Sequence, residues 1–340
     1  MQSEKYSRDN AGQSLKKYIL LKQGELAYNH GASKAKQFGC CYELTEPEAR
    51  IPYVYHCFKV NNTEYTPYIA MALNNAKMDK QLKRLVSSSA RMDGLLNISF
   101  EDYMSVTLHL PSPKEQKRVA DFLEKIDERI TTQEKLLASL KKYKRGLLSN
   151  LFDEKSTQGW TTKSYYFSEI AQRRSEKYDP TSGIEYSCVE LENIEQETGK
   201  ILSTVPSTAQ SSIKNIAMSG DTLFGKLRPY LRKYAFAQKT MACSSEIWVF
   251  IPSDVVLPKF LFYLVQTEQF LRVANISSGT KMPRAEWSNI EKAEFIIPDR
   301  FIQHKVVSLL EGMDQRITFA DSVLFCLSRL KASLVQQLFI

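Results

Sequence analysis

The sequence predicts an α+β fold in which two globular modules are separated by two long antiparallel coiled-coil helices, arranged as an internal repeat with pseudo-two-fold symmetry. Three observations support this prediction. A long segment recurs at an offset of 187 residues, both copies carry a heptad pattern of apolar residues, and strand-like runs mix with helix-like runs ahead of each copy. The length of 340 residues suits two modules, since one domain commonly takes about 150 residues.

The internal repeat aligns residues 111–152 with residues 298–339 without a gap. Of the 42 aligned positions, 15 are identical, and they include Asp127 with Asp314 and Lys144 with Lys331. Similarity of this length indicates two copies of one structural unit.

Each copy has apolar residues at alternating steps of four and three for more than four heptads, which is the a/d seam of a coiled coil. Lys144 and Lys331 interrupt the two seams at the same place, and a polar residue at such a position fixes the register of pairing at a cost in stability. The residues expected to pair the helices are Leu123, Ile126, Ile130, Leu137 and Leu140 in the first copy, and Leu310, Met313, Ile317, Leu324 and Leu327 in the second.

Start signals mark both helices. Ser112 is a predicted N-cap, Pro113 occupies the first helical position and Glu115 completes a capping box, whereas Asp299 is a weaker N-cap for the second helix. Each helix is expected to run for about 38 residues, or roughly 55–60 Å at the α-helical rise. Mutual antiparallel pairing of the two copies is the simplest way to bury both seams. An ordinary helical hairpin would explain the pairing but not the length.

The rest of the chain forms two modules that we expect to be α+β. The predicted divisions are a first module over residues 1–111, a long helix over 112–155, a second module over 156–298 and a second long helix over 299–340. The second module has strand-like runs at 246–251 and 293–297 and one amphipathic helix at 258–273, and the first has a helix near 68–85. Short strands at 106–111 and 295–298 lead into the long helices.

The two modules also share a turn and differ in length. Gly24 and Gly220 each end an apolar strand and are followed by an acidic residue. About 60 residues precede Gly220 when they are counted from Trp160, whereas 23 precede Gly24. The first module is therefore shortened relative to the second.

The net charge is mildly basic, which is only weak evidence for a polyanionic partner. The chain has 46 Lys and Arg against 38 Asp and Glu, a net charge of +8. Six cations and one anion lie between Lys214 and Lys239, just after an acidic stretch over residues 185–197. Such segregation can build a one-sided field, although a solvated mixed surface is the simpler interpretation.

Several kinds of site are not expected. The six cysteines form no C-x-x-C pair and no histidine lies at metal-ligand spacing from one, which disfavours a zinc site. The sequence has no phosphate-binding loop, dinucleotide fingerprint or zinc-protease motif, and no Asn-Pro-Pro-aromatic run for methylation of a base. The apolar runs are too short to span a membrane and Met1–Asn10 has no signal core, so we expect a cytoplasmic protein without catalytic activity.

The helix signatures and two loop motifs resemble a known family. Residues 219–230, Ser-Gly-Asp-Thr-Leu-Phe-Gly-Lys-Leu-Arg-Pro-Tyr, are similar to a motif in the target recognition domains of type I restriction-modification specificity subunits. The segment from Ser277 to Arg284 resembles the loop before the final strand of those domains. The two repeated helices resemble the central and C-terminal conserved helices of the family. The resemblance covers essentially residues 15–340, with a shortened first target recognition domain.

The resemblance implies a non-catalytic subunit that confers DNA-sequence specificity. Its two target recognition domains would each read one half of a bipartite site in double-stranded DNA, and the paired helices would set the gap between the half-sites. The helices would also bind two methyltransferase subunits, and restriction or motor subunits would join for cleavage. No cofactor is expected in this chain, because S-adenosylmethionine, ATP and Mg belong to the partner subunits, and no membrane partner is expected.

Cations that lie beside aromatic residues or in polar loops are the candidate DNA contacts, because Lys and Arg bind phosphates and base edges. The candidates are Lys226, Arg228, Arg232 and Lys233, Lys281 and Arg284, Arg173, Arg174 and Lys177, and in the first module Lys34 and Lys36. The first four could instead only snorkel around an apolar core. Trp287 is interpreted as a packing anchor and His30 as a surface residue.

Two other functions compete with DNA recognition. A coiled-coil scaffold that binds no nucleic acid would explain the heptads but not the basic runs with interleaved aromatic residues. A self-sufficient nuclease or methylase is disfavoured by the missing motifs. The salt dependence of DNA binding distinguishes DNA recognition from the coiled-coil scaffold, because phosphate contacts make affinity fall steeply with salt. Turnover without a partner would support the nuclease or methylase.

Overall fold

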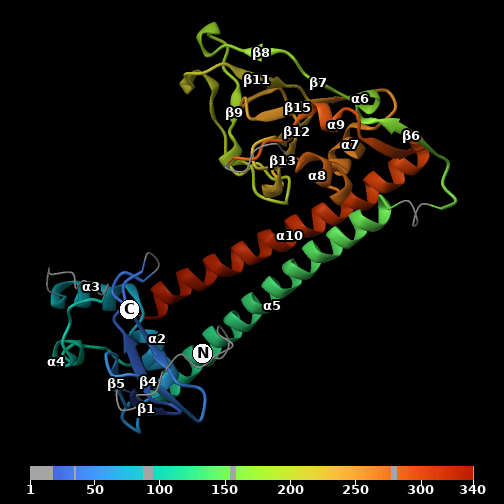
Figure 1. Ribbon diagram of the computed structural model, residues 1–340. Helices are drawn as coiled ribbons and strands as arrows, with labels where there is room; N and C mark the ends of the chain where they lie inside the picture. Colours follow the sequence, from blue (N-terminus) through green and yellow to red (C-terminus); the bar gives the residue numbers. More distant parts are fainter. Residues whose placement is uncertain (1–17, 34–35, 87–94, 154–157, 277–281, 340) are drawn as a thin grey trace. The chain divides into compact units, whose positions relative to one another are not determined.

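The computed structural model describes residues 18–33, 36–86, 95–153, 158–276 and 282–339 (Figure 1). The chain divides into two compact units. Unit 1 consists of Met1–Lys135 and Ser322–Ile340, and unit 2 consists of Leu136–Asp321. Each unit thus contains one globular module and parts of both long helices.

Both predicted long helices are present as α5 (Pro113–Leu151) and α10 (Arg300–Leu338), each of 39 residues. The structure supports the predicted start signals in part at Ser112 and in full at Asp299. The Ser112 N–H donates to Glu115 Oε2 at 3.2 Å, as in a capping box, and the Ser112 hydroxyl donates to the same oxygen at 2.7 Å. These hydrogen bonds hold the pKa of Glu115 below its usual value. Asp299 Oδ1 accepts the Ile302 N–H at 2.9 Å, as an N-cap should.

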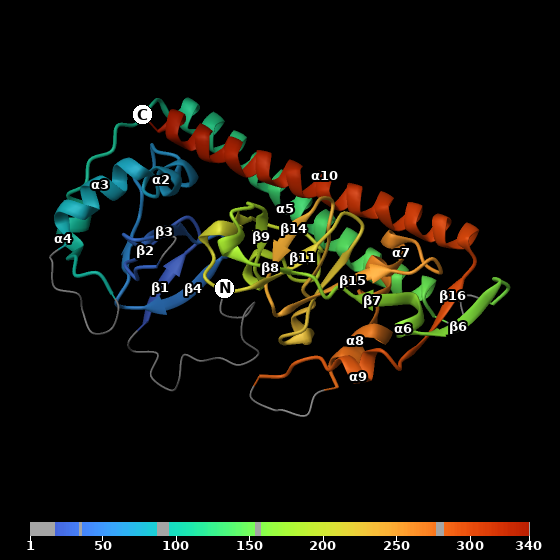
Figure 2. The ribbon, with the colours of Figure 1, turned by 90° about the horizontal axis from the view of Figure 1, so that it is seen from above.

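In unit 2 the described strands form three sheets, of order β10-β9-β14-β11-β8, β13-β12-β15-β7 and β16-β6 (Figure 2). The strands are β6 (Thr162–Tyr166), β7 (Ala171–Arg173), β8 (Lys177–Tyr178), β9 (Ser187–Val189), β10 (Val205–Pro206), β11 (Lys214–Ala217), β12 (Thr222–Gly225), β13 (Tyr234–Phe236), β14 (Met241–Cys243), β15 (Ile247–Pro252) and β16 (Glu294–Pro298). The helices are α6 (Phe167–Ile170), α7 (Pro258–Leu264), α8 (Glu268–Ala274) and α9 (Trp287–Ile290), with short 3-10 turns η2 (Pro180–Ser182), η3 (Leu191–Asn193), η4 (Ser207–Ala209) and η5 (Pro229–Leu231). The α+β class and the strands predicted at 246–251, 293–297 and 295–298 are confirmed.

The single helix predicted at 258–273 is wrong, because the structure divides it into α7 and α8. The Thr267 hydroxyl accepts the Phe270 N–H at 3.3 Å and caps a new helix there. Both helices bury apolar faces against the β12–β15 sheet in a core that includes Phe250, Phe260 and Phe270. The apolar pattern runs on across the break, which is why it predicts one helix.

Unit 1 repeats part of this arrangement. Its described strands form a pair, β1-β4, and a three-stranded sheet, β3-β2-β5. The elements are β1 (Tyr18–Lys22), β2 (Leu26–Asn29), β3 (Cys40–Glu43), β4 (Glu48–Pro52), β5 (His56–Phe58), α2 (Thr66–Ala72), α3 (Ala76–Leu85) and α4 (Phe100–Met104). The helix predicted near 68–85 is also divided, since Asn75 caps α3 by accepting the N–H groups of Lys77 and Met78.

The topology extends the repeat beyond the long helices. The β1-β4 pair corresponds to β11-β14, the β3-β2-β5 sheet to β13-β12-β15, and α2 and α3 to α7 and α8. Residues 106–111, predicted as a strand, form none among the described residues. Their counterpart β16 pairs with β6, and the described part of unit 1 has no strand equivalent to β6. A strand needs such a partner for its backbone groups.

A repeated glutamine docks each long helix onto its module. In unit 1, Gln116 accepts the Tyr65 N–H at 2.9 Å and donates to the Pro111 carbonyl at 2.9 Å. In unit 2, Gln303 accepts the Leu257 N–H at 2.8 Å and donates to the Pro298 carbonyl at 2.9 Å. Both side chains are buried, so the start of each long helix is fixed to the start of α2 or α7.

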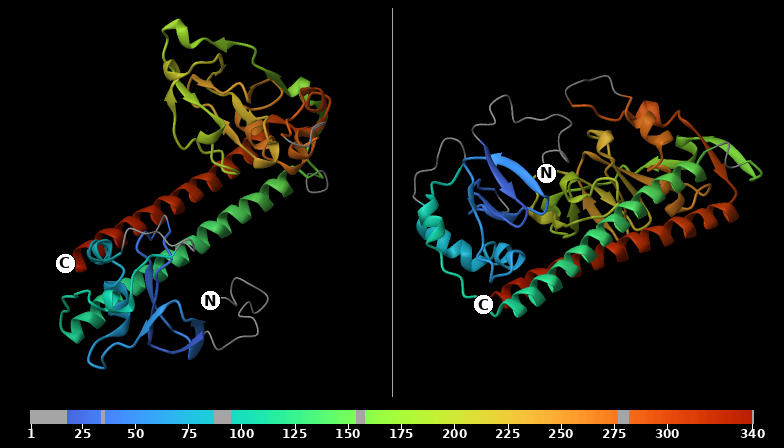
Figure 3. Two further views of the ribbon diagram at one scale, coloured as in Figure 1. Left: turned by 60° about the vertical axis from the view of Figure 1, so that its left-hand side comes forward. Right: turned by 90° about the horizontal axis from the view of Figure 1, so that it is seen from below.

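In each unit α5 and α10 lie side by side (Figures 1 and 3). Lys331 Nζ lies 2.5 Å from Asp127 Oδ1 in unit 1, and Lys144 Nζ lies 2.6 Å from Asp314 Oδ1 in unit 2. The seam lysine of each repeat therefore pairs with the aspartate of the other, which is the contact that an antiparallel two-fold arrangement produces.

The residues predicted to pair the helices are all buried or half-buried. The buried ones are Leu123, Ile126, Leu137, Leu310 and Met313, and the half-buried ones are Ile130, Leu140, Ile317, Leu324 and Leu327.

Candidate nucleic-acid interface

The loop after β12 holds two arginines in the left-handed backbone region. Arg228 has φ 51° and ψ 62°, and Arg232 has φ 50° and ψ 48°, on either side of η5. A non-glycine residue in this region costs roughly 1–2 kcal/mol, so the surrounding contacts must hold it there. The Arg228 N–H donates to the Pro283 carbonyl at 2.8 Å, which fixes the loop from outside.

Residues 283–285 lie along this loop and are joined to it through main-chain atoms. Leu227 and Arg284 form an antiparallel bridge, and the Ala285 N–H donates to the Lys226 carbonyl at 2.8 Å. Two segments that the sequence singles out separately thus form one surface. Lys281 and the preceding residues 277–280 lie outside the described residues.

The cations of this loop differ in whether their side chains already contact other polar groups of the protein. Arg228 is exposed and Lys226 is half-buried, and neither side chain forms an ion pair with another described residue. Arg232 lies 2.7 Å from Glu268, and Lys233 donates to the Leu191 carbonyl at 2.6 Å. Arg228 and Lys226 are therefore the cations most available to a ligand.

Arg284 is oriented by a residue that the sequence does not single out. Its guanidinium makes a fork of two hydrogen bonds to Glu246, at 3.1 and 3.2 Å, and this contact raises the pKa of Arg284. The two residues are far apart in the sequence and meet only because Glu246 precedes β15. The paired arginine keeps an exposed face but carries less uncompensated charge than Arg228.

The basic patch around β7 and β8 separates into different roles. Arg173 is exposed, and its guanidinium carbon lies 4.8 Å from the Trp287 ring centroid and 5.8 Å from that of Trp248. Trp287 packs against core aromatic rings, as predicted for an anchor. Lys177 is exposed and donates to Asn215 Oδ1 at 2.6 Å. The stack presents the flat guanidinium of Arg173 at the surface.

Arg174 belongs to the interior and not to the surface that the sequence predicts. Its guanidinium forms hydrogen bonds of 2.7 and 3.1 Å with Asp221, and the two side chains are only 9% and 3% exposed. These bonds raise the pKa of Arg174. Asp221 also accepts the Met218 N–H at 2.7 Å, so the acidic residue after Gly220 fixes the turn and neutralises a buried cation.

Unit 1 has the same loop frame with other side chains. Gly31 forms a bridge with Leu95, which corresponds to the Leu227–Arg284 bridge of unit 2. The Leu96 N–H donates to the His30 carbonyl at 2.9 Å, and this hydrogen bond corresponds to the one from Ala285 to Lys226. His30 is buried, which contradicts its interpretation as a surface residue, and its ring nitrogens lie 3.0 and 2.6 Å from the carbonyl oxygens of Leu96 and Val54.

The two lysine candidates of unit 1 add little to that loop. Lys36 is half-buried and donates to the Asn74 carbonyl at 3.2 Å, and Lys34 lies outside the described residues.

The described residues contain no group of three or more His, Cys, Asp or Glu that could hold a metal ion. Within the same residues, every helix is too short or too polar to cross a bilayer.

Comparison with known proteins shows which family this chain resembles. The model of the type I restriction modification DNA specificity domain matches residues 173–321. The specificity subunit of the type I restriction enzyme HindI from Haemophilus influenzae is 27% identical over 144 residues, which cover 40% of this chain and 30% of that subunit. The EcoDI specificity subunit from Escherichia coli is 21% identical over 259 residues, which cover 65% of this chain and 57% of that subunit. Less than two thirds of either relative is therefore spanned.

Solved structures share the fold. A chain from a structure concerning complex assembly and conformational transition of the type I R-M system gives a TM-score of 0.58 at 14% identity, covering 94% of this chain and 82% of that chain. The S subunit of the type I restriction-modification system of M. genitalium gives 0.54 at 14% identity, covering 98% and 86%. The chain is therefore similar in sequence and in fold to the specificity subunits of type I restriction-modification systems, and residues 173–321 match the model of their DNA specificity domain.

Proposed function

We propose that this chain gives a type I restriction-modification complex its DNA-sequence specificity, and that unit 2 reads double-stranded DNA with residues 226–230 and 282–284. The observation that supports this most is the main-chain connection between these two segments. A loop held on both sides keeps its side chains in one geometry, which base recognition requires. Arg228, which has no ion pair with another described residue and whose backbone is held in the left-handed region, is the leading candidate for a base contact.

The cations divide into base-reading and backbone-binding roles. A free guanidinium can bind guanine O6 and N7 with two hydrogen bonds, and this suits Arg228. Arg173 and Lys177 lie outside that loop, on β7 and β8, where contacts to phosphates would orient the module without reading sequence. Arg284, bound to Glu246, would position the loop.

We further propose that unit 1 contacts the second half of a bipartite site. It has the same loop frame as unit 2, with the Gly31–Leu95 bridge in the corresponding place. Where unit 2 has Lys226 and Arg228, unit 1 has the buried His30 and Ala32. Different side chains on one frame would let the two halves of the site differ in sequence.

The long helices are proposed to bind two methyltransferase subunits, which restriction or motor subunits would join. Large apolar side chains are exposed on both helices, and exposed apolar patches commonly mark protein interfaces. These side chains are Phe122, Leu136 and Tyr143 on α5, and Phe301, Leu309, Phe319, Phe325 and Leu330 on α10. Methylation and cleavage would take place on the partners, which would hold S-adenosylmethionine, ATP and Mg.

An electrophoretic shift of duplex DNA by this chain with its methyltransferase tests the proposal. We expect a complex that prefers one bipartite sequence and whose affinity falls steeply with salt. Arg228→Ala should relax preference at one base pair by about 1–3 kcal/mol, whereas Lys239→Ala, which removes an exposed cation between β13 and β14, should not. Equal affinity for all sequences, or binding without salt dependence, would favour the coiled-coil scaffold instead.

A further inference from the structure

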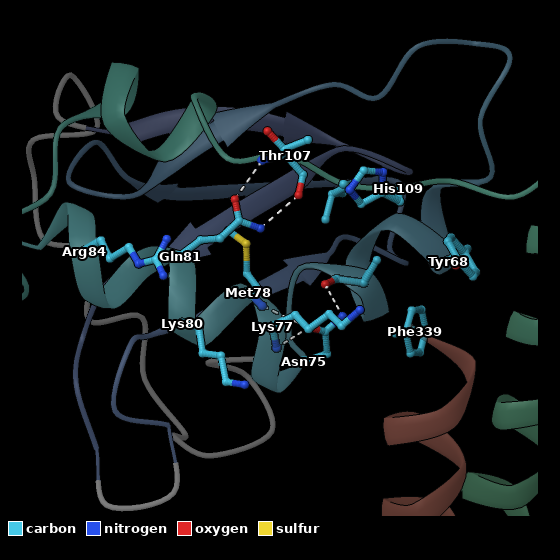
Figure 4. Close-up of a pocket in the computed structure, with 12 residues that line it drawn as sticks. Tyr68, Asn75, Lys77, Met78, Lys80, Gln81, Arg84, Thr107, His109 and Phe339 are labelled. Atoms are coloured by element: carbon cyan, nitrogen blue, oxygen red, sulfur yellow. Dashed lines mark hydrogen bonds between the residues drawn. The ribbon is translucent and has the colours of Figure 1, made fainter.

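A groove of about 530 Å³ lies in unit 1 between α3, residues 107–109 and the C-terminal end of α10. Its floor is apolar and includes Tyr68 and Phe339, whose ring centroids are 5.1 Å apart. Its rim carries Lys77, Lys80 and Arg84 from α3 (Figure 4). None of these three cations was singled out from the sequence as a binding residue.

Hydrogen bonds hold the walls of the groove in place. Gln81 Nε2 donates to the Thr107 carbonyl at 2.9 Å, and Gln81 Oε1 accepts the Thr107 N–H at 3.0 Å, which ties residues 107–109 to α3. Asn75 caps the start of α3 by accepting the Lys77 N–H at 2.8 Å. The side chain of His109 completes the wall opposite α3 (Figure 4).

The cations of the rim are uncompensated. Lys77, Lys80 and Arg84 are exposed, and none forms an ion pair with another described residue. Their spacing of three and four residues places them on one face of α3. No Asp or Glu is among the described residues that line the groove. The groove therefore carries a positive charge that its own residues do not neutralise.

Unit 2 has an equivalent groove with a different charge. It lies between α8 and the end of α5, has a volume of about 470 Å³, and has Phe152 and Thr267 where unit 1 has Phe339 and Asn75. Its lining includes Asp153, Glu268 and one cation, Arg272. The groove thus follows from the repeated fold, whereas the positive rim belongs to unit 1 alone.

We propose that this rim binds the phosphodiester backbone of DNA outside the loop that reads bases, an inference that rests on the proposed DNA-binding function. From Lys77 to Arg84 the rim extends over about 10 Å of α3, at 1.5 Å per residue. One DNA strand has a phosphate for every 3.4 Å of duplex, so a rim of this length can face about three phosphates. The three side chains point in different directions along α3 and do not converge (Figure 4), which suits an extended polyanion better than one small phosphate ion.

The test compares the salt dependence of DNA binding by the methyltransferase complex for two variants. Lys77→Gln/Lys80→Gln/Arg84→Gln removes the rim, and Lys83→Gln removes an exposed cation of α3 that does not line the groove. Each lost phosphate contact lowers the slope of log affinity against log salt by about 0.9, so the triple variant should lose about 2–3 units of slope for specific and non-specific duplexes alike. The Lys83 variant should match the wild type, and both variants should melt as it does.

The failures of the two proposals are distinguishable. If the wild-type complex shows no sequence preference, the proposed function fails. If it does show preference and the triple variant keeps the wild-type slope, only the groove inference is overturned. Tripolyphosphate should displace DNA from the wild-type complex at concentrations at which polyglutamate has no effect. Loss of this displacement in the triple variant supports phosphate recognition by the rim. Selective displacement by polyglutamate, or tripolyphosphate binding without any change in DNA affinity in the triple variant, overturns the inference.

Discussion

Lys144 and Lys331 occupy the same place in the two repeats, yet their replacement should have unequal effects on stability. The Lys144 side chain is 8% exposed and its partner Asp314 is 33% exposed. The Lys331 side chain is 36% exposed and its partner Asp127 is 45% exposed. The two pairs have similar lengths, so exposure to solvent is the main difference between them.

The magnitudes follow from burial. Removal of one partner from a buried ion pair costs about 3–5 kcal/mol, because the other charge is left unpaired. Asp314 is one third exposed and still accepts a hydrogen bond of 2.8 Å from Tyr263, so we reduce this to about 2–3 kcal/mol for Lys144→Met. For Lys331→Met, an exposed pair gives about 0–1 kcal/mol. At roughly 2–4 °C per kcal/mol, Tm should fall by about 4–12 °C in the first variant and by at most about 4 °C in the second.

Thermal melting of the two variants, followed by circular dichroism, measures this difference. The double variant Lys144→Met/Asp314→Leu should recover much of the loss, because an apolar pair of similar volume can replace a buried ion pair. Equal shifts for Lys144→Met and Lys331→Met would refute the argument from burial. A double variant no more stable than Lys144→Met would show that the cost does not come from an unpaired carboxylate.

Two other predictions concern burial in each unit. Leu137→Asp should destabilise the protein by several kcal/mol, because the seam buries this side chain to 8% exposure. Leu136→Asp replaces a side chain that is 47% exposed and should change Tm little. Equal melting of both variants would show that the seam is assigned to the wrong face of the helix. Burial raises the pKa of the Cys41 thiol to about 12, so a maleimide at pH 8 should label the exposed Cys326 rapidly and leave Cys41 unmodified until the protein unfolds, and rapid labelling of Cys41 would contradict its buried position.

Local patterns predict the long helices well and the short elements less well. The heptads, the Ser112 capping box and Asp299 predict α5 and α10 because each signal acts within a few residues of the backbone that it organises. The predictions at 258–273 and 68–85 were wrong because the apolar period continues through Thr267 and Asn75, although both are N-cap residue types that could have signalled the breaks. The strand predicted at 106–111 depends on a partner strand, which no local pattern supplies.

The candidate surface could be predicted as a set of cations but not as a distribution of charge. Arg174 is neutralised by Asp221 and Arg284 by Glu246, and each partner lies far along the sequence. Only the fold brings such pairs together, so composition cannot distinguish a buried ion pair from a free cation. The groove rim on α3 could have been recognised, since its cations follow helical spacing.

The bridge between the two loop segments uses main-chain atoms in both units. Leu227 and Arg284 in unit 2, and Gly31 and Leu95 in unit 1, form the same kind of main-chain bridge while carrying unrelated side chains. Because peptide groups are common to all residues, this frame leaves the neighbouring side chains free to vary with little cost to folding. Under the proposed function, exchange of a few exposed residues would change the target sequence, and the same positions could be randomised on an intact scaffold.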